Sequence, residues 1–163
     1  MKTIYVVRHA KSSWQTIGQK DHERPLHSEG LRRMKKVNDY LVKNKVKPDL
    51  IISSHAVRAY ETARLIAADL GYQETQIMQD REIYLGNEDS LLEIVFALPD
   101  HLESVMLVGH NPIITGFAQM FQARIPEDMP TSAVVSISID TKNWNQILMA
   151  TKNVNFYVYP KML

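Results

Sequence analysis

The sequence predicts an α/β fold, namely a three-layer α/β/α sandwich with a mainly parallel central sheet and an antiparallel edge. Short β-branched runs alternate with longer segments of helical periodicity through most of the chain, which is typical of parallel strands covered by helices on both faces. After residue 132 the helical pattern stops, and two strand-like runs predict a β segment that closes one edge. The 163 residues and the short connections predict a single domain, residues 1–163.

The N-terminal part predicts a strand, a long polar connection and a helix. Residues 3–7, TIYVV, predict a buried strand. Residues 11–27 are polar and without apolar periodicity, and loops of this length in compact domains often carry function. Residues 28–44 predict a helix with Ser28 as its N-cap and with a basic, solvated outer face. Its apolar face comprises Leu31, Met34, Val37, Tyr40 and Leu41.

In the rest of the chain, predicted strands and helices continue to alternate up to about residue 132, and only strands are predicted after it. The predicted strands are residues 48–54, 76–80, 104–109, 133–140 and 146–159, the last two joined by a turn over 141–145. The predicted helices are residues 56–71, closed by Gly71, residues 88–99, ended by Pro99, and residues 111–122, with Pro112 in the first turn.

Composition excludes several classes of protein. Apolar residues make up 45% and charged residues 23%, and the net charge of +1 gives no global field that would favour nucleic acid or a membrane surface. The absence of cysteine excludes disulfides, thiolate metal sites and cysteine nucleophiles. No N-terminal apolar run is long enough for a signal peptide, and none is long enough for a membrane helix. A cytoplasmic location is therefore expected.

Three of the predicted buried strands end on cationic or imidazole side chains. These side chains are Arg8 and His9 after the first strand, His55 and Arg58 after the second, and His110 with Asn111 after the fourth. The C-terminal ends of parallel strands lie along one edge of a sheet, so these groups can converge there. Each alone would more often be an ordinary surface residue, but the repetition favours a site. Guanidinium forks and imidazole N–H groups are suited to phosphoryl oxygens, so the sequence predicts an anion pocket.

Two other kinds of phosphate or metal site are not expected. The six histidines show no i, i+4 pair on a predicted helix and no HExxH motif, which argues against a metal site. The six glycines are scattered singly, so a Walker-type phosphate loop is absent from the sequence.

The segments VVRHAKSSWQ, SSHAVRAYETA and LVGHNP resemble the three signature segments of the histidine phosphatase superfamily, which includes the phosphoglycerate mutases. With RPLHSEG and the short chain, they are most similar to the SixA-type phosphohistidine phosphatases. The resemblance spans Ile4 to about Val135 and implies a phosphoglycerate mutase-like fold. It also implies a metal-independent phosphatase that acts through a phosphohistidine intermediate and needs no cofactor.

The resemblance assigns a role to each matching residue. His9 would be the nucleophile, and Arg8, Arg58 and His110 would bind the phosphoryl oxygens, with His110 also counted as catalytic. Ser12 and Gln15 fall where the family places further polar contacts with phosphate. The general acid would be Glu82, in DREIYLG, with Glu88 as the alternative. His55 stands where the family often has proline, and Ala10 where many members have glycine.

The substrate remains open between three readings of this pocket. A phosphohistidine-bearing protein is the leading expectation by resemblance. The alternatives are a small-molecule phosphomonoesterase or mutase of the same fold, and a phosphoprotein-binding module without turnover. The intact pair Arg8–His9 argues against the binding module, because a module that only binds has no need of the nucleophile. The sequence does not indicate an oligomeric state. The short stretch between Arg58 and His110 leaves little chain for a lid, so a shallow, open crevice is expected.

Overall fold

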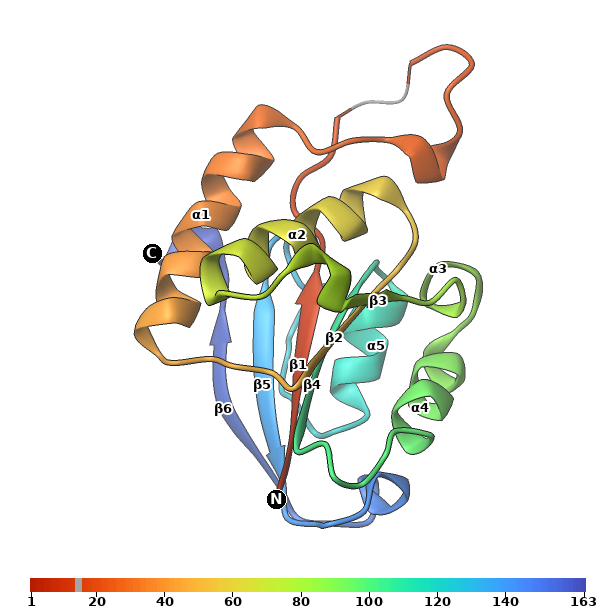
Figure 1. Cartoon of the computed structure of the whole chain (residues 1–163), viewed down its shortest axis with the longest axis vertical. Helices are drawn as coiled ribbons and strands as arrows, with labels where there is room; N and C mark the ends of the chain where they lie inside the picture. The colour runs from red at the N-terminus through yellow and green to blue at the C-terminus, as the bar shows by residue number, and fades with distance from the viewer. Residues whose placement is uncertain (14–15) are drawn as a thin grey trace.

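A six-stranded sheet forms the middle layer of the computed structural model, which describes residues 1–13 and 16–163 (Figure 1). The strand order is β3-β2-β4-β1-β5-β6. The strands are β1 (Lys2–Arg8), β2 (Leu50–Ser53), β3 (Ile77–Gln79), β4 (Ser104–Gly109), β5 (Val134–Ile139) and β6 (Lys152–Val158). The first four are paired in parallel, β5 is antiparallel to β1, and β6 is antiparallel to β5. The predicted mainly parallel sheet with an antiparallel edge is confirmed.

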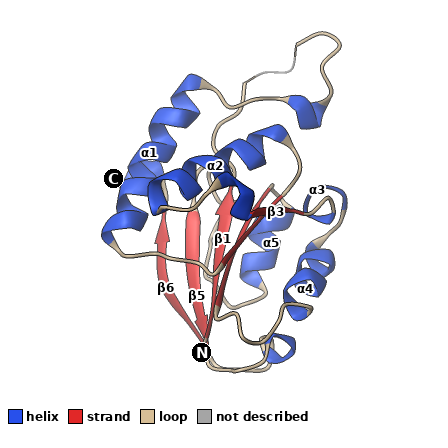
Figure 2. Ribbon diagram, in the orientation of Figure 1, coloured by secondary structure: helices blue, strands red, loops and turns tan. Residues whose placement is uncertain are grey.

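Helices cover both faces of this sheet (Figure 2). They are α1 (Ser28–Lys43), α2 (Val57–Leu70), α3 (Glu82–Leu85), α4 (Glu88–Phe96) and α5 (Ile113–Gln119). The first two pack on one face, and α4 and α5 on the other. Four short 3₁₀ turns complete the described chain: η1 (Asp21–Glu23), η2 (Glu74–Gln76), η3 (Trp144–Gln146) and η4 (Pro160–Met162).

The central strands are apolar on both sides because both faces are covered. Val6 and Leu107 point into the core beneath α4 and α5, whereas their neighbours Val7 and Val108 point into the core beneath α1 and α2. All four are fully buried. This alternation explains why β1 and β4 are continuous apolar runs in the sequence, without the polar residues of a half-exposed strand.

Several predicted boundaries are wrong, and the helices predicted over 88–99 and 111–122 end three residues earlier, at Phe96 and Gln119. His27, and not Ser28, is the N-cap of α1, because its Nδ1 accepts the backbone N–H of Glu29 at 3.0 Å. The last strand begins at Lys152, because the residues before it form η3 and a turn instead of an extended strand. Trp144 holds that turn in place: it is fully buried, and its indole Nε1 donates to the carbonyl of Leu102 at 3.0 Å.

The C-terminal ends of β2, β4 and β1 lie next to one another at one edge of the sheet. In Figure 1 this edge is at the top, where the arrow of β1 ends, and the N-terminus lies at the opposite edge. The residues that follow these three strands are therefore neighbours in space. Among the described residues, no helix combines the length and the apolar character that crossing a membrane requires.

Candidate active site

An open pocket of about 420 Å³ lies at this edge of the sheet. Four of the residues predicted for the phosphoryl site, Arg8, His9, Arg58 and His110, line it together, and Ser12 joins them. The other lining residues are Lys11, Arg24, Asn111 and Thr131. Four of the nine lining side chains are lysine or arginine and none is a carboxylate, so the described wall of the pocket suits an anion.

His9 continues the line of β1 and is held by its own loop. Its backbone N–H donates to the carbonyl of Gly109 at 3.1 Å, and its ring Nδ1 lies 2.7 Å from the carbonyl oxygen of Ala10. A carbonyl oxygen can only accept, so Nδ1 carries the hydrogen and Nε2 keeps its lone pair. The N–H of Ala10 donates in turn to Thr62 Oγ1 at 2.9 Å, which fixes the loop to α2. His9 is thereby oriented as a nucleophile through Nε2.

His110 lies beside His9, with 5.1 Å between the ring centroids. Its Nε2 is 2.8 Å from Ser54 Oγ, which already accepts the N–H of Ala56 at 3.1 Å and has its own hydrogen to donate. Nδ1 is buried and has no hydrogen-bond partner among the described residues. His110 therefore has one unpaired ring nitrogen next to the nucleophile.

Burial keeps both rings neutral. Desolvation lowers the pKa of His9 most, the positive charges of Arg58 and Arg8 add to this effect, and the hydrogen bond to Ala10 opposes it, so that the pKa is about 4. Desolvation likewise lowers the pKa of His110 to about 3, with the neighbouring His9 and Arg58 acting in the same direction. A neutral imidazole has the free lone pair that attack on phosphorus requires, so His9 is in its reactive form at pH 7.

Each of the two predicted arginines uses some of its guanidinium N–H groups in hydrogen bonds within the protein and keeps others unpaired. Arg8, at the end of β1, donates from Nη1 to the carbonyl of Met129 at 2.8 Å, and its buried Nε has no partner among the described residues. Arg58, in the first turn of α2, donates from Nη1 to the carbonyl of Asp21 at 2.8 Å and from Nη2 to the Asp21 carboxylate at 3.0 Å. Each guanidinium keeps further N–H donors for an anion.

Asp21 connects the two sides of the pocket. Its carboxylate accepts from Arg58, from Arg24 Nη1 at 3.1 Å and from the hydroxyl of Tyr84 at 2.7 Å. The hydrogen bond from Tyr84, together with the two arginines, holds the pKa of Asp21 well below its usual range. Asp21 does not line the pocket, but it fixes two guanidiniums that do. It therefore acts as a positioning residue.

The other predicted site residues have mixed outcomes. Ser12 lines the pocket, and its hydroxyl accepts from Arg24 Nη2 at 3.0 Å. Gln15 lies outside the described residues. Neither Glu82, which is exposed, nor Glu88 lines the pocket. Glu88 lies against α5 instead, because a Cβ at Gly116 would come within 2.5 Å of its Oε1.

His55 lies in a cluster of rings next to the pocket. Its ring centroid is 5.3 Å from that of Tyr84 and 5.7 Å from that of His22. Tyr84 also packs edge-on against His110, with centroids 5.4 Å apart. This contact connects His55 to the pocket through Tyr84, so His55 supports the wall without lining it.

Asn111, predicted at the end of the fourth strand, lines the pocket, but sequence reasoning missed Lys11, Arg24 and Thr131 as lining residues and Asp21 and Tyr84 behind them. Most of them lie in loops, where no apolar periodicity indicates which side chain points inward. One signal was available for Arg24, because it opens RPLHSEG, a segment that carries part of the family resemblance.

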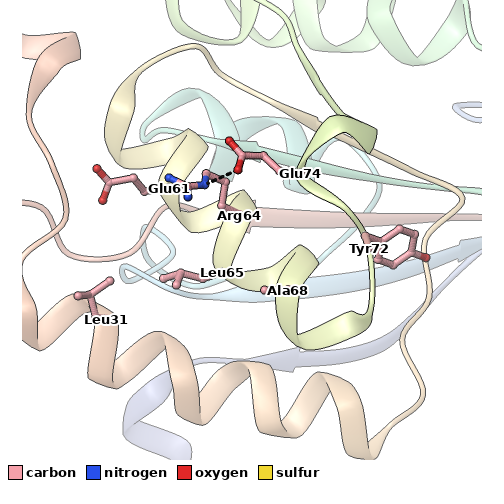
Figure 3. Close-up of a pocket in the computed structure, with 7 residues that line it drawn as sticks. All are labelled: Leu31, Glu61, Arg64, Leu65, Ala68, Tyr72 and Glu74. Atoms are coloured by element: carbon pink, nitrogen blue, oxygen red, sulfur yellow. Dashed lines mark ion pairs between the residues drawn. The ribbon is translucent and has the colours of Figure 1, made fainter.

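A second hollow, of about 310 Å³, lies between α1 and α2 (Figure 3). It is lined by Leu31, Glu61, Arg64, Leu65, Ala68, Tyr72 and Glu74. Arg64 is paired with Glu74 at 3.2 Å, and Leu31 is 45% exposed although the sequence predicts it on the apolar face of α1. The hollow shares no residue with the pocket around His9. Among the described residues, no group of three or more His, Asp or Glu side chains could hold a metal ion.

Residues 4–93, more than half of the chain, match the histidine phosphatase superfamily (branch 1). An uncharacterized chloroplastic protein of Arabidopsis thaliana is 30% identical over 119 residues, which are 68% of this chain and 54% of that one. The chain thus spans about half the length of this relative.

Solved structures have the same fold. A protein from Agrobacterium tumefaciens assigned as the phosphohistidine phosphatase SixA superposes with a TM-score of 0.84, at 25% identity and with 98% of both chains covered. A protein histidine phosphatase SixA complexed with tungstate gives a TM-score of 0.81, at 20% identity and with the same coverage. Together with this fold, the family match shows that the chain belongs to the histidine phosphatase superfamily.

Proposed function

We propose that the protein hydrolyses phosphohistidine on another protein, through a phosphoryl group carried transiently by His9. The observation that carries the proposal is the orientation of His9, whose Nδ1 is held by the carbonyl of Ala10 while the ring lines a pocket with Arg8 and Arg58. The resemblance to SixA-type proteins in sequence and fold supports the choice of substrate.

In the first step, Nε2 of His9 attacks phosphorus and the bond from phosphorus to the substrate nitrogen breaks. Arg8, Arg58 and His110, which line the pocket together, hold the equatorial oxygens, where charge is concentrated in phosphoryl transfer. The substrate nitrogen takes back the electron pair of the broken bond. The imidazole leaves as a neutral molecule if its other nitrogen already carries a hydrogen.

In the second step, water attacks the phosphoryl group on His9. The bond to Nε2 breaks, its electron pair returns to the ring, and the proton released by water leaves the site with the phosphate product. The Nδ1–H of His9 stays hydrogen-bonded to the carbonyl oxygen of Ala10 in both steps. The ring therefore needs no change of tautomer to return to its starting state.

The absence of a carboxylic acid from the described wall of the pocket favours a nitrogen leaving group over an alkoxide. An alkoxide needs a proton from a general acid as the bond to phosphorus breaks, whereas imidazole needs it far less. Neither Glu82 nor Glu88 lines the described part of the pocket, so neither is in place to give that proton. This supports phosphohistidine as the substrate over sugar phosphates and phosphoglycerates.

The test is a comparison of turnover on a phosphohistidine peptide, an aryl phosphate, sugar phosphates and phosphoglycerates. We expect the phosphohistidine peptide to give the highest kcat/KM. Rapid mixing with labelled substrate and an alkaline quench should trap an alkali-stable, acid-labile phosphoenzyme. The same adduct in His9→Ala would overturn the assignment of the nucleophile.

The variants Glu82→Gln and Glu88→Gln test the leaving group. Both should retain turnover of phosphohistidine within about threefold, because protonation of the leaving imidazole contributes little to the barrier. A large loss on phosphohistidine in either variant, or a preference of the wild type for a sugar phosphate, would contradict the proposed substrate.

A further inference from the structure

A third hollow, of about 350 Å³, opens beside the catalytic pocket, and we call it the basic groove. It is lined by Arg33 and Lys36 from α1, Pro130 and Thr131 from the segment before β5, and Tyr159, Pro160 and Lys161 at the C-terminal end. The turn η4 packs against α1, and Figure 1 shows the C-terminal end of the chain beside this helix. Three of its seven described lining residues are cations and none is acidic.

The basic groove is continuous with the catalytic pocket, because Thr131 lines both. When the phosphorylated side chain of a substrate protein enters the catalytic pocket, the neighbouring residues of that substrate must cross the rim of the pocket. Thr131 offers one such path, and it leads towards Lys36 and Lys161. The groove is therefore placed to contact residues close in sequence to the phosphorylated one.

Cations outnumber carboxylates along this path. Lys11, which lines the catalytic pocket, and Arg33, which lines the groove, share one carboxylate, that of Glu29. Lys36 and Lys161 are exposed, and neither has an ion-pair partner within the described chain. These four cations have one carboxylate among their ion-pair partners, although the whole chain carries a net charge of only +1. The excess is local, and local excess charge attracts the opposite charge.

The surface changes sign beyond Tyr159. The adjoining hollow shares Pro130 and Tyr159 with the basic groove but is lined by Glu127 and Asp128. The positive surface therefore ends at Tyr159 on this side, a short way from the catalytic pocket, which suits a short peptide segment better than the evenly spaced phosphates of a nucleic acid.

We propose that the basic groove binds acidic side chains that flank the phosphorylated histidine of the substrate protein. The proposal rests on the proposed function and adds to it a preference for sequence. The groove holds the segment while the phosphoryl group occupies the pocket at His9, so its contribution is to KM for protein substrates and not to the chemistry of the phosphoryl group.

The test uses phosphohistidine peptides of one sequence in which the flanking positions are either Glu and Asp or Gln and Asn. The wild type should process the acidic peptide with a kcat/KM about tenfold higher, mostly through KM, and the difference should shrink as salt is raised. In Lys36→Glu/Lys161→Glu the preference should vanish or reverse. The matched control is Lys47→Glu/Lys142→Glu, which changes the net charge equally at two exposed lysines outside the groove and should keep the preference.

Turnover of a small aryl phosphate distinguishes a failure of the proposed substrate from a failure of the proposed groove function. Lys36→Glu/Lys161→Glu should retain it at the wild-type rate, which shows that the variant is folded and the catalytic pocket intact. If the wild type turns over the aryl phosphate but neither phosphohistidine peptide, the proposed substrate fails. If it turns over both peptides equally, or if a short oligonucleotide competes while the unphosphorylated acidic peptide does not, the proposed groove function fails.

Discussion

The hydrogen bond from His9 Nδ1 to the carbonyl of Ala10 determines which ring nitrogen can react. Without it, neutral His9 could adopt either tautomer, and only one presents a lone pair at Nε2. The 2.7 Å contact is made within the loop that follows β1, so it requires no distant residue. The charge of the ring has a different cause, because burial of His9, which is 7% exposed, keeps it neutral.

The protonation state of His9 can be measured directly. Because its pKa is lowered to about 4, the ring should stay neutral as the pH falls from 8 to 5, where an unperturbed histidine with a pKa of 6.5 would gain a proton. The measurement is the pH dependence of the imidazole NMR signals, with His9→Gln to assign them and urea-unfolded protein as the control. A His9 titration with a midpoint near 6.5 in the folded protein would contradict the prediction.

At the scale of elements, the site joins three strand ends to one irregular segment. The strand ends could be predicted from the sequence, because an apolar run that stops at Arg8 or His110 marks both the strand and its boundary. The segment before α1 could not, because residues such as Asp21 and Arg24 follow no periodicity and reach the site only through tertiary contacts. The same reason applies to the start of β6, where burial of Trp144 overrides a strand-like sequence.

The backbone of this segment is held against α1 as well as α2. A Cβ on Gly30, in the first turn of α1, would collide with the backbone carbonyl of Lys11, so only glycine permits the observed approach. The N–H of Leu26 donates to Glu61 of α2 at 3.3 Å. The turn η1 is thereby fixed where Asp21 can reach Arg58.

Asp21→Asn tests whether η1 positions the arginines. The variant keeps the shape but loses the charge that holds Arg24 and Arg58, so kcat should fall on the order of tenfold through misplacement of the two guanidiniums. Inorganic phosphate should inhibit more strongly, because the two cations lose the carboxylate that partly neutralises them. Steady-state kinetics with phosphate as inhibitor measure both effects. A fall in kcat with unchanged inhibition by phosphate would indicate a merely structural role.

The variant Tyr84→Phe removes one of the three donors to Asp21, so it should show smaller changes of the same sign in kcat and in inhibition by phosphate.

At the scale of the whole molecule, the catalytic edge lowers stability in acid. The pKa values of His9 and His110 in the folded protein, about 4 and about 3, lie below the value of about 6.5 expected for the unfolded chain. Between these limits the unfolded state binds more protons than the folded state, so the free energy of unfolding rises with pH. The pKa of His55 is also lowered by burial, and this contribution has the same sign. The stability is thus complete above about pH 6.5 and decreases as the pH falls below it.

The pH dependence of the free energy of unfolding, measured by urea denaturation between pH 7.5 and 4.5, tests this account. Each buried neutral histidine should contribute a slope of up to about 1.4 kcal/mol per pH unit in the lower part of that range. His9→Gln and His110→Gln should each reduce the slope, and the double variant should reduce it most, whatever their effect on stability at pH 7.5. His101→Gln is the matched control, because His101 is exposed and remote from the pocket, and it should leave the slope as in the wild type. A slope that is unchanged in the double variant would show that the two pocket histidines take up protons equally in the folded and unfolded states, and would contradict the neutral, buried pair on which the proposed chemistry depends.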